Sequence, residues 1–108
     1  MVWKIILFEN KRGEKPVEYF IKSLSAATIA KVVHEIDLLE RHGNMLRIPH
    51  SKMISNNLYE LRIRGKEEVR IFYTFKIRNI YLLHSFKKKS QKTPAKEIKV
   101  AKNRLDTV

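Results

Sequence analysis

The strongest constraint on the fold is an alternation of apolar and polar residues in segments that follow one another between residues 58 and 86. In residues 58–64 the odd-numbered positions are apolar, whereas Arg62 and Arg64 share the opposite face of an extended chain. Two further segments, 69–75 and 80–86, are rich in β-branched and aromatic residues, which favour strands. Only short turns separate these segments, so we expect three consecutive strands of an antiparallel meander.

Two helices are predicted before this meander. Pro16 suits a first helical position, and apolar residues follow it at helical spacing. Ser25 suits the N-cap of a second helix, and Gly43 suits the position just after its end. The second helix carries a single apolar face, made by Ile29, Val32, Val33, Ile36 and Leu39.

The remaining segments complete a single α+β domain over residues 1–108. Residues 2–8 are nearly all apolar and predict a strand buried on both faces, and a short strand is expected near Met53 and Ile54. A C-terminal helix is predicted with Thr93 as N-cap and Pro94 as its first residue. We therefore expect an antiparallel sheet of four to five strands, with two N-terminal helices on one face, a basic C-terminal helix, and an uncovered face for a partner.

The net charge of +12 indicates a polyanionic partner, nucleic acid before an anionic membrane. Residues 87–104 contain eight basic residues and one acid, so +7 of this charge lies in one segment. The chain has no cysteine, no glycine-rich phosphate loop, no cluster of acids and no long apolar run. These features predict a cytoplasmic protein with no metal site, no small-molecule cofactor and no membrane segment.

Candidate functional residues follow the positive charge. Arg62 and Arg70 are expected side by side on neighbouring strands, where two cations oppose folding unless an anion such as phosphate compensates them. Arg64 lies nearby, and Phe72 shares the parity of Arg70 and could stack on a base. His84 is a candidate for proton transfer. The loop that follows it offers Lys87, Lys88, Lys89, Gln91 and Lys92 as phosphate contacts.

Three segments, LYELRIR (58–64), RIFY (70–73) and LLHSFKKKSQKTP (82–94), resemble the RelE/HigB toxin superfamily, in particular its phage-derived HigB-like branch. This resemblance implies a microbial RNase fold and an mRNA interferase that cuts messages on the ribosome without a metal ion. It also implies a cognate antitoxin, either acidic or with a helix-turn-helix. Arg70 corresponds to an arginine that contacts the scissile phosphate in RelE-like members, whereas Glu60 departs from the basic pattern of its strand.

The implied chemistry agrees with the residues. Metal-free RNA cleavage needs a base for the 2′-hydroxyl, cations for the crowded phosphorane and an acid for the leaving 5′-oxygen, and it produces a 2′,3′-cyclic phosphate. Arg62, Arg70, His84 and Lys88 are the predicted catalytic residues, and Arg64, Lys87, Lys89, Gln91 and Lys92 the predicted RNA contacts. A non-catalytic RNA- or ribosome-binding domain is the main alternative. A DNA-binding regulator is disfavoured because no helix-turn-helix pair is evident.

Overall fold

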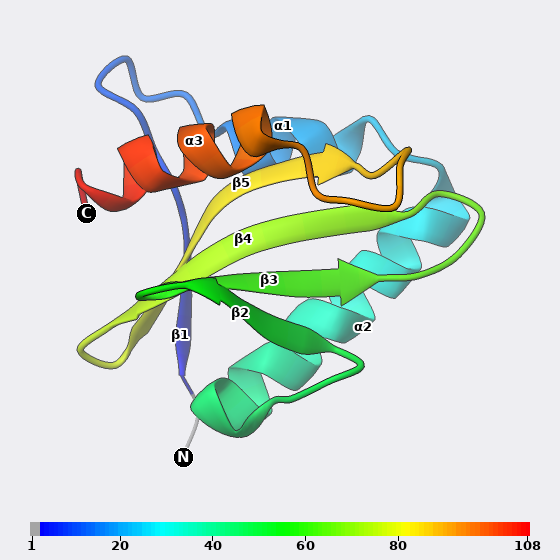
Figure 1. Cartoon of the computed structure of the whole chain (residues 1–108), viewed down its shortest axis with the longest axis horizontal. Coiled ribbons are helices and arrows are strands. Elements are labelled where there is room, and N and C mark those ends of the chain that lie inside the picture. Colours follow the sequence, from blue (N-terminus) through cyan, green and yellow to red (C-terminus); the bar gives the residue numbers. More distant parts are fainter. Residues whose placement is uncertain (1–2) are drawn as a thin grey trace.

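The computed structural model describes residues 3–108 and contains a five-stranded sheet with helices on both faces (Figure 1). In chain order its elements are β1 (Lys4–Leu7), α1 (Pro16–Lys22), α2 (Ala26–His42), the 3₁₀ turn η1 (Gly43–Met45), β2 (Ser51–Ser55), β3 (Leu58–Ile63), β4 (Val69–Lys76), β5 (Asn79–Lys87) and α3 (Ala95–Leu105). The meander of β3, β4 and β5, the short strand β2 and both N-terminal helices are therefore confirmed.

The sheet is mixed, and the expectation of a purely antiparallel sheet is wrong. The strand order is β1-β5-β4-β3-β2; β2 to β5 pair antiparallel, but β1 pairs parallel with β5. Short turns force antiparallel pairing only on the strands that they join. β1 and β5 are instead joined by the two helices and by β2, β3 and β4, a connection long enough for parallel pairing. As an edge strand, β1 is only partly buried, not buried on both faces; Val2, at the start of the expected strand, lies outside the described residues.

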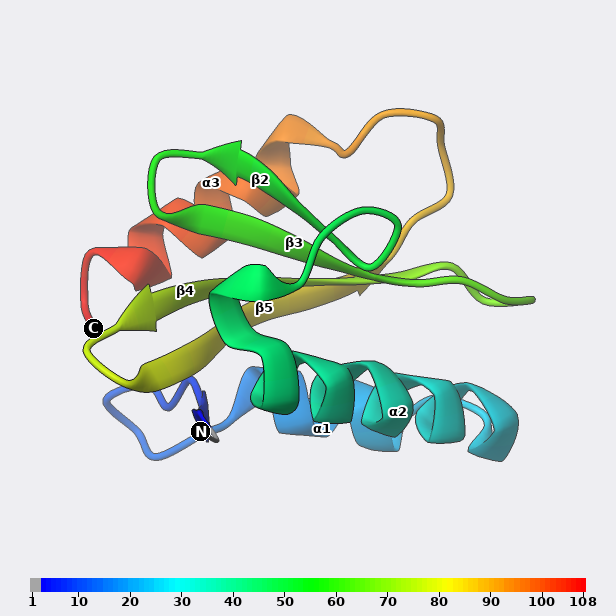
Figure 2. The same ribbon diagram turned by 90° about the horizontal axis from the view of Figure 1, so that it is seen from below.

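Helices α1 and α2 cover one face of the sheet, as Figure 2 shows. Val17 of α1 and Val32 and Leu39 of α2 are fully buried against apolar side chains of β3, β4 and β5. Val33, expected in the apolar stripe, is 58% exposed because it lies one helical step of about 100° beyond Val32, away from the sheet. Burial of this face is what sets the rotation of α2.

The ends of α2 follow the local sequence. The hydroxyl of Ser25 accepts a hydrogen bond from the amide of Thr28 at 3.3 Å, which confirms Ser25 as the N-cap. Gly43 ends the helix with φ +52°, a value that glycine adopts without strain. A Cβ on Gly43 would overlap the indole of Trp3, so the same glycine also lets Trp3 pack against the end of α2.

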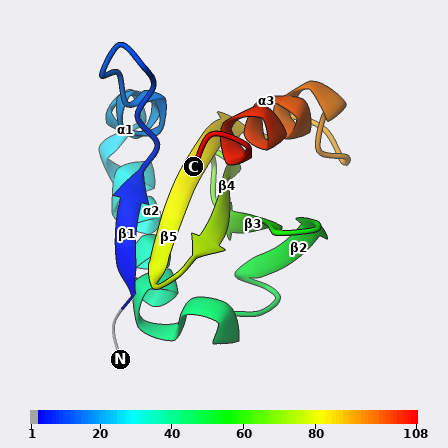
Figure 3. The ribbon, with the colours of Figure 1, turned by 90° about the vertical axis from the view of Figure 1, so that its left-hand side faces the viewer.

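Helix α3 lies on the opposite face and covers part of it, so the expectation of a wholly uncovered face is wrong (Figure 3). Ala101 of α3 and Phe72, Leu83 and Phe86 of the sheet form a second buried cluster. Phe72 is fully buried there, which removes it as a stacking platform for a base. The N-cap of α3 is Pro94, one residue later than expected. Among the described residues, no helix is both long and apolar enough to cross a membrane.

Candidate nucleic-acid interface

A hollow lined mainly by cations lies where the β3–β4 turn meets the loop between β5 and α3. Figure 2 shows this turn and this loop at the same end of the sheet. The hollow has a volume of about 380 Å³. Its lining residues are Arg62, Arg64, Glu68, Arg70, Lys88, Lys89, Ser90 and Gln91. Five cations thus face one carboxylate, and we call this site the cationic hollow.

The floor of the cationic hollow is a pair of arginines on neighbouring strands. Arg62 and Arg70 are direct cross-strand partners, as the alternation in the sequence predicts. The amide of Arg62 donates to the carbonyl of His50 at 2.8 Å, away from β4. The two arginines therefore form a non-hydrogen-bonded pair, the closer of the two antiparallel spacings, with Cα atoms roughly 4.5 Å apart. Two like charges this close oppose folding, so the fold must supply compensating anions.

Arg70 is the deepest cation of the hollow, with only 4% of its side chain exposed. Its Nη1 donates to the carbonyl of Val69 at 3.0 Å and its Nη2 to Oε1 of Glu68 at 3.2 Å. Its Nε is buried and has no hydrogen-bond acceptor among residues 3–108. Although partial burial opposes it, hydrogen bonds from the Gly65 amide and from Arg70 lower the pKa of Glu68. Glu68 therefore stays ionised and holds the guanidinium in place.

The second compensating anion is Glu60, whose side chain is only 1% exposed. Its Oε1 accepts a hydrogen bond from Nε of Arg62 at 3.2 Å and lies 3.8 Å from Nε of Arg70. Its Oε2 accepts a hydrogen bond from the hydroxyl of Thr93 at 2.9 Å. This hydroxyl anchors the basic loop instead of capping α3. The alternation in the sequence already places Glu60 on the same strand face as Arg62 and Arg70. The sequence analysis nevertheless did not assign Glu60 as their counter-ion.

The loop after β5 is attached to the sheet at both ends. Its first residues extend the β4–β5 pairing, because the amide of Lys88 donates to the carbonyl of Glu68 at 2.8 Å. Its far end is held by Thr93 on Glu60. Within the loop, the hydroxyl of Ser90 donates to the carbonyl of Lys92 at 2.8 Å. These contacts hold the loop so that Lys88 and Lys89 line the same hollow as the two arginines.

Two of the predicted RNA contacts lie outside the cationic hollow. Lys92 is exposed but does not line the hollow. Nζ of Lys87 makes an ion pair with Oε2 of Glu67 at 2.7 Å. The hydroxyls of Ser25 and Thr28 donate to the other oxygen of Glu67. The hydrogen bond from Lys87, followed by those from the two hydroxyls, lowers the pKa of Glu67 to about 2, so this network links the hairpin to the start of α2.

His84 also lies outside the hollow, beneath α3. Arg104 can only donate, so Nδ1 of His84, 3.3 Å from Nη1 of Arg104, is the acceptor. Nε2 therefore carries the proton and donates to Oε1 of Glu97 at 2.7 Å. Burial lowers the pKa of His84 and outweighs the opposite effect of Glu97. The ring is thus neutral with both nitrogens occupied, and the structure does not bring it together with the other predicted catalytic residues.

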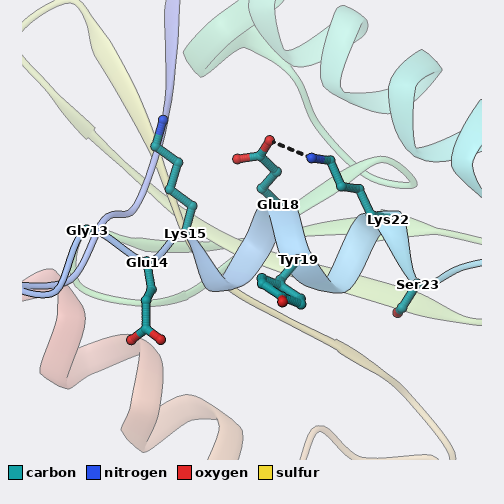
Figure 4. Close-up of a pocket in the computed structure, with 7 residues that line it drawn as sticks. All are labelled: Gly13, Glu14, Lys15, Glu18, Tyr19, Lys22 and Ser23. Atoms are coloured by element: carbon teal, nitrogen blue, oxygen red, sulfur yellow. Dashed lines mark ion pairs between the residues drawn. The ribbon is translucent and has the colours of Figure 1, made fainter.

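A larger hollow of about 730 Å³ lies along α1, and Figure 4 shows the side chains that line it. It contains acids as well as bases, including an ion pair between Glu18 and Lys22 at 3.2 Å. Tyr19 projects from it with 80% of its surface exposed. Opposite charges that neutralise one another do not attract a polyanion, so the cationic hollow, despite its smaller volume, is the candidate for a nucleic-acid interface.

Comparison with known proteins adds one match. The sequence matches the family described as "Phage derived protein Gp49-like (DUF891)" over residues 19–106. This range begins within α1 and includes every residue that lines the cationic hollow. No curated protein matches the chain.

Proposed function

We propose that this chain, which belongs to the Gp49-like family of phage-derived proteins, is the toxin of a toxin–antitoxin module and cuts mRNA on the ribosome. The family is of a toxin type and is related to RelE and HigB. A toxin of this kind has a cognate antitoxin, and a helix-turn-helix protein is the form we propose for it.

The cationic hollow is the observation that carries this proposal. Its cations come from β3, from the turn after it, from β4 and from the loop after β5. The hydrogen bonds of Glu60 and Glu68 hold Arg62 and Arg70 in fixed positions, and the bond from Thr93 to Glu60 attaches the loop. Fixed cations that surround one point stabilise the extra negative charge of a phosphorane better than mobile side chains do. A lining with five cations and one acid also attracts phosphate and repels a divalent metal ion, which supports cleavage without metal.

The proposed reaction is attack by the 2′-hydroxyl on the adjacent phosphorus. The hydroxyl proton passes to solvent water, a 2′,3′-cyclic phosphate forms, and the bond to the 5′-oxygen of the next nucleotide breaks. Arg62 and Arg70 stabilise the phosphorane from the floor of the hollow. Lys88 lines the same hollow, and its ammonium group is the proposed proton donor to the leaving oxygen. Glu97 and Arg104 occupy the ring nitrogens of His84, which favours a supporting role for His84 in holding α3 against the sheet.

End mapping of cellular RNA after induced expression tests the activity. We expect new 3′ ends that carry a 2′,3′-cyclic phosphate and new 5′ ends that carry a hydroxyl. The double variant Arg62→Gln/Lys88→Gln should reduce cleavage by at least about 100-fold, the usual effect of losing a group that stabilises the transition state. Lys4→Gln/Lys11→Gln, which alters two exposed lysines away from the hollow, is the charge-matched control.

Circular dichroism verifies that both variants are folded. New ends that carry a 5′-phosphate would refute the proposed chemistry, and an unchanged rate in the double variant would refute the site. Growth arrest with intact messages would identify a non-catalytic RNA- or ribosome-binding domain instead.

A further inference from the structure

Helix α3 separates its charged residues onto two faces. Glu97 points to the sheet and accepts the hydrogen bond of His84. Arg104 also points inward, donates to the carbonyl of Leu83 at 2.9 Å and lies 5.1 Å from the ring centre of Phe8. The outward face carries three exposed lysines, Lys96, Lys99 and Lys102, which we call the lysine face. The single acid within α3 is therefore used internally, and the charge that the helix shows to its surroundings is positive.

The lysine face is not explained by the stability of the helix. Its members are three residues apart, so successive side chains are neighbours on one side of the helix, and like charges at this spacing are unfavourable. No carboxylate among residues 3–108 makes an ion pair with any of them. Lys102 in the last turn suits the helix dipole, but Lys96 in the first turn opposes it. An external anion would relieve this repulsion.

The lysine face continues from the loop that borders the cationic hollow. Figure 1 shows this loop leaving the end of β5 and α3 running back along the sheet from it. Exposed Lys92 lies in this loop. At about 1.5 Å per residue, the lysine face extends this positive surface along the helix by roughly 9 Å from Lys96 to Lys102. A ligand that contacts the whole lysine face is therefore larger than the few nucleotides that the hollow can hold.

We propose that the lysine face binds the phosphate backbone of folded, double-helical RNA, separately from the strand that is cut. Proteins that hold single strands stack bases on aromatic side chains, and α3 contains no aromatic residue. A row of lysines spaced by one helix matches phosphates of fixed geometry and carries no base-reading contact. The inference rests on the proposed function, because a toxin that acts on the ribosome meets folded RNA around its substrate.

Direct binding to two RNA probes tests the proposal without requiring cleavage. The probes are a 20-base-pair RNA duplex and an unstructured single strand of 20 adenosines, each titrated by fluorescence anisotropy at several salt concentrations. The variant is Lys96→Gln/Lys99→Gln/Lys102→Gln, since glutamine preserves helix propensity. The charge-matched control is Lys4→Gln/Lys11→Gln/Lys15→Gln, which alters three exposed lysines in β1 and the segment after it.

For the duplex, we expect the α3 variant to lose affinity by on the order of 100-fold at 0.1 M salt, and its salt dependence to fall by about 2 to 3 in log–log slope. The control variant and the binding of the single strand should change little. Unchanged duplex affinity, or an equal loss for both probes, would overturn the proposal. Retention of duplex binding together with loss of binding to an acidic protein partner would assign the lysine face to that partner. If the wild type leaves mRNA intact but duplex binding still depends on α3, only the proposed nuclease activity fails.

Discussion

Replacement of Glu60 by glutamine separates the role of its charge from the role of its shape. Glutamine has nearly the same size, and its oxygen can still accept the hydrogen bond from Thr93. The substitution removes the negative charge that lies 3.2 Å from Nε of Arg62 and 3.8 Å from Nε of Arg70. The loop attachment is thus retained while the arginine pair loses its buried counter-ion.

The expected loss of stability follows from the burial of the three side chains. Removing one partner of a fully buried ion pair costs about 3–5 kcal/mol. Arg70 keeps its contact with Glu68, and Arg62 is 18% exposed, so both retain some compensation. We therefore expect Glu60→Gln to lower the free energy of unfolding by about 2–3 kcal/mol. For a domain of this size, that corresponds to a fall of about 10 °C in Tm.

Urea and thermal unfolding followed by circular dichroism measure this effect. Glu68→Gln is the matched control, since it removes the other carboxylate on Arg70 from a position that is 36% exposed, where about 1 kcal/mol or less is expected. Inorganic phosphate should stabilise Glu60→Gln more than it stabilises the wild type, because the hollow becomes more positive. A change below about 0.5 kcal/mol, or an equal loss in Glu68→Gln, would refute the reasoning.

Two further predictions concern pH. The pKa of Glu67 is lowered from 4.5 to about 2 in the folded chain, so its carboxylate stabilises the fold fully above pH 4.5, and this contribution is lost as the pH falls toward 2. The urea midpoints of wild type and Glu67→Gln should therefore differ at pH 7 and converge near pH 2; a constant difference would contradict this. Burial lowers the pKa of His84 below 6.5, so its neutral ring contributes stability that is lost as the pH falls below that value. An NMR titration should show a midpoint below 6.5 and a proton on Nε2, and a midpoint at or above 6.5 would exclude the buried neutral ring.

Local patterns in the sequence were sufficient for the element order and for part of the site. The period of two and the short turn at residues 65–68 place Arg62 opposite Arg70, because a hairpin register is determined by residues close together in the chain. The cap at Ser25 and the helix break at Gly43 are equally local. The basic loop was recognisable from its composition, because residues 87–92 contain four lysines between two predicted elements.

Contacts between distant segments decided the remainder. The parallel pairing of β1 with β5 joins strands at opposite ends of the chain, which no short sequence pattern specifies. The packing of α3 on the second face buries Phe72 and takes His84 out of the hollow. Glu60 becomes a buried counter-ion only when β3, β4 and the loop meet around it.

The sequence by itself determined which charges the chain carries and on which strand faces they lie. Only the tertiary structure decided which of them are neutralised and which remain free to bind phosphate, because ion pairing depends on distances between segments far apart in the chain.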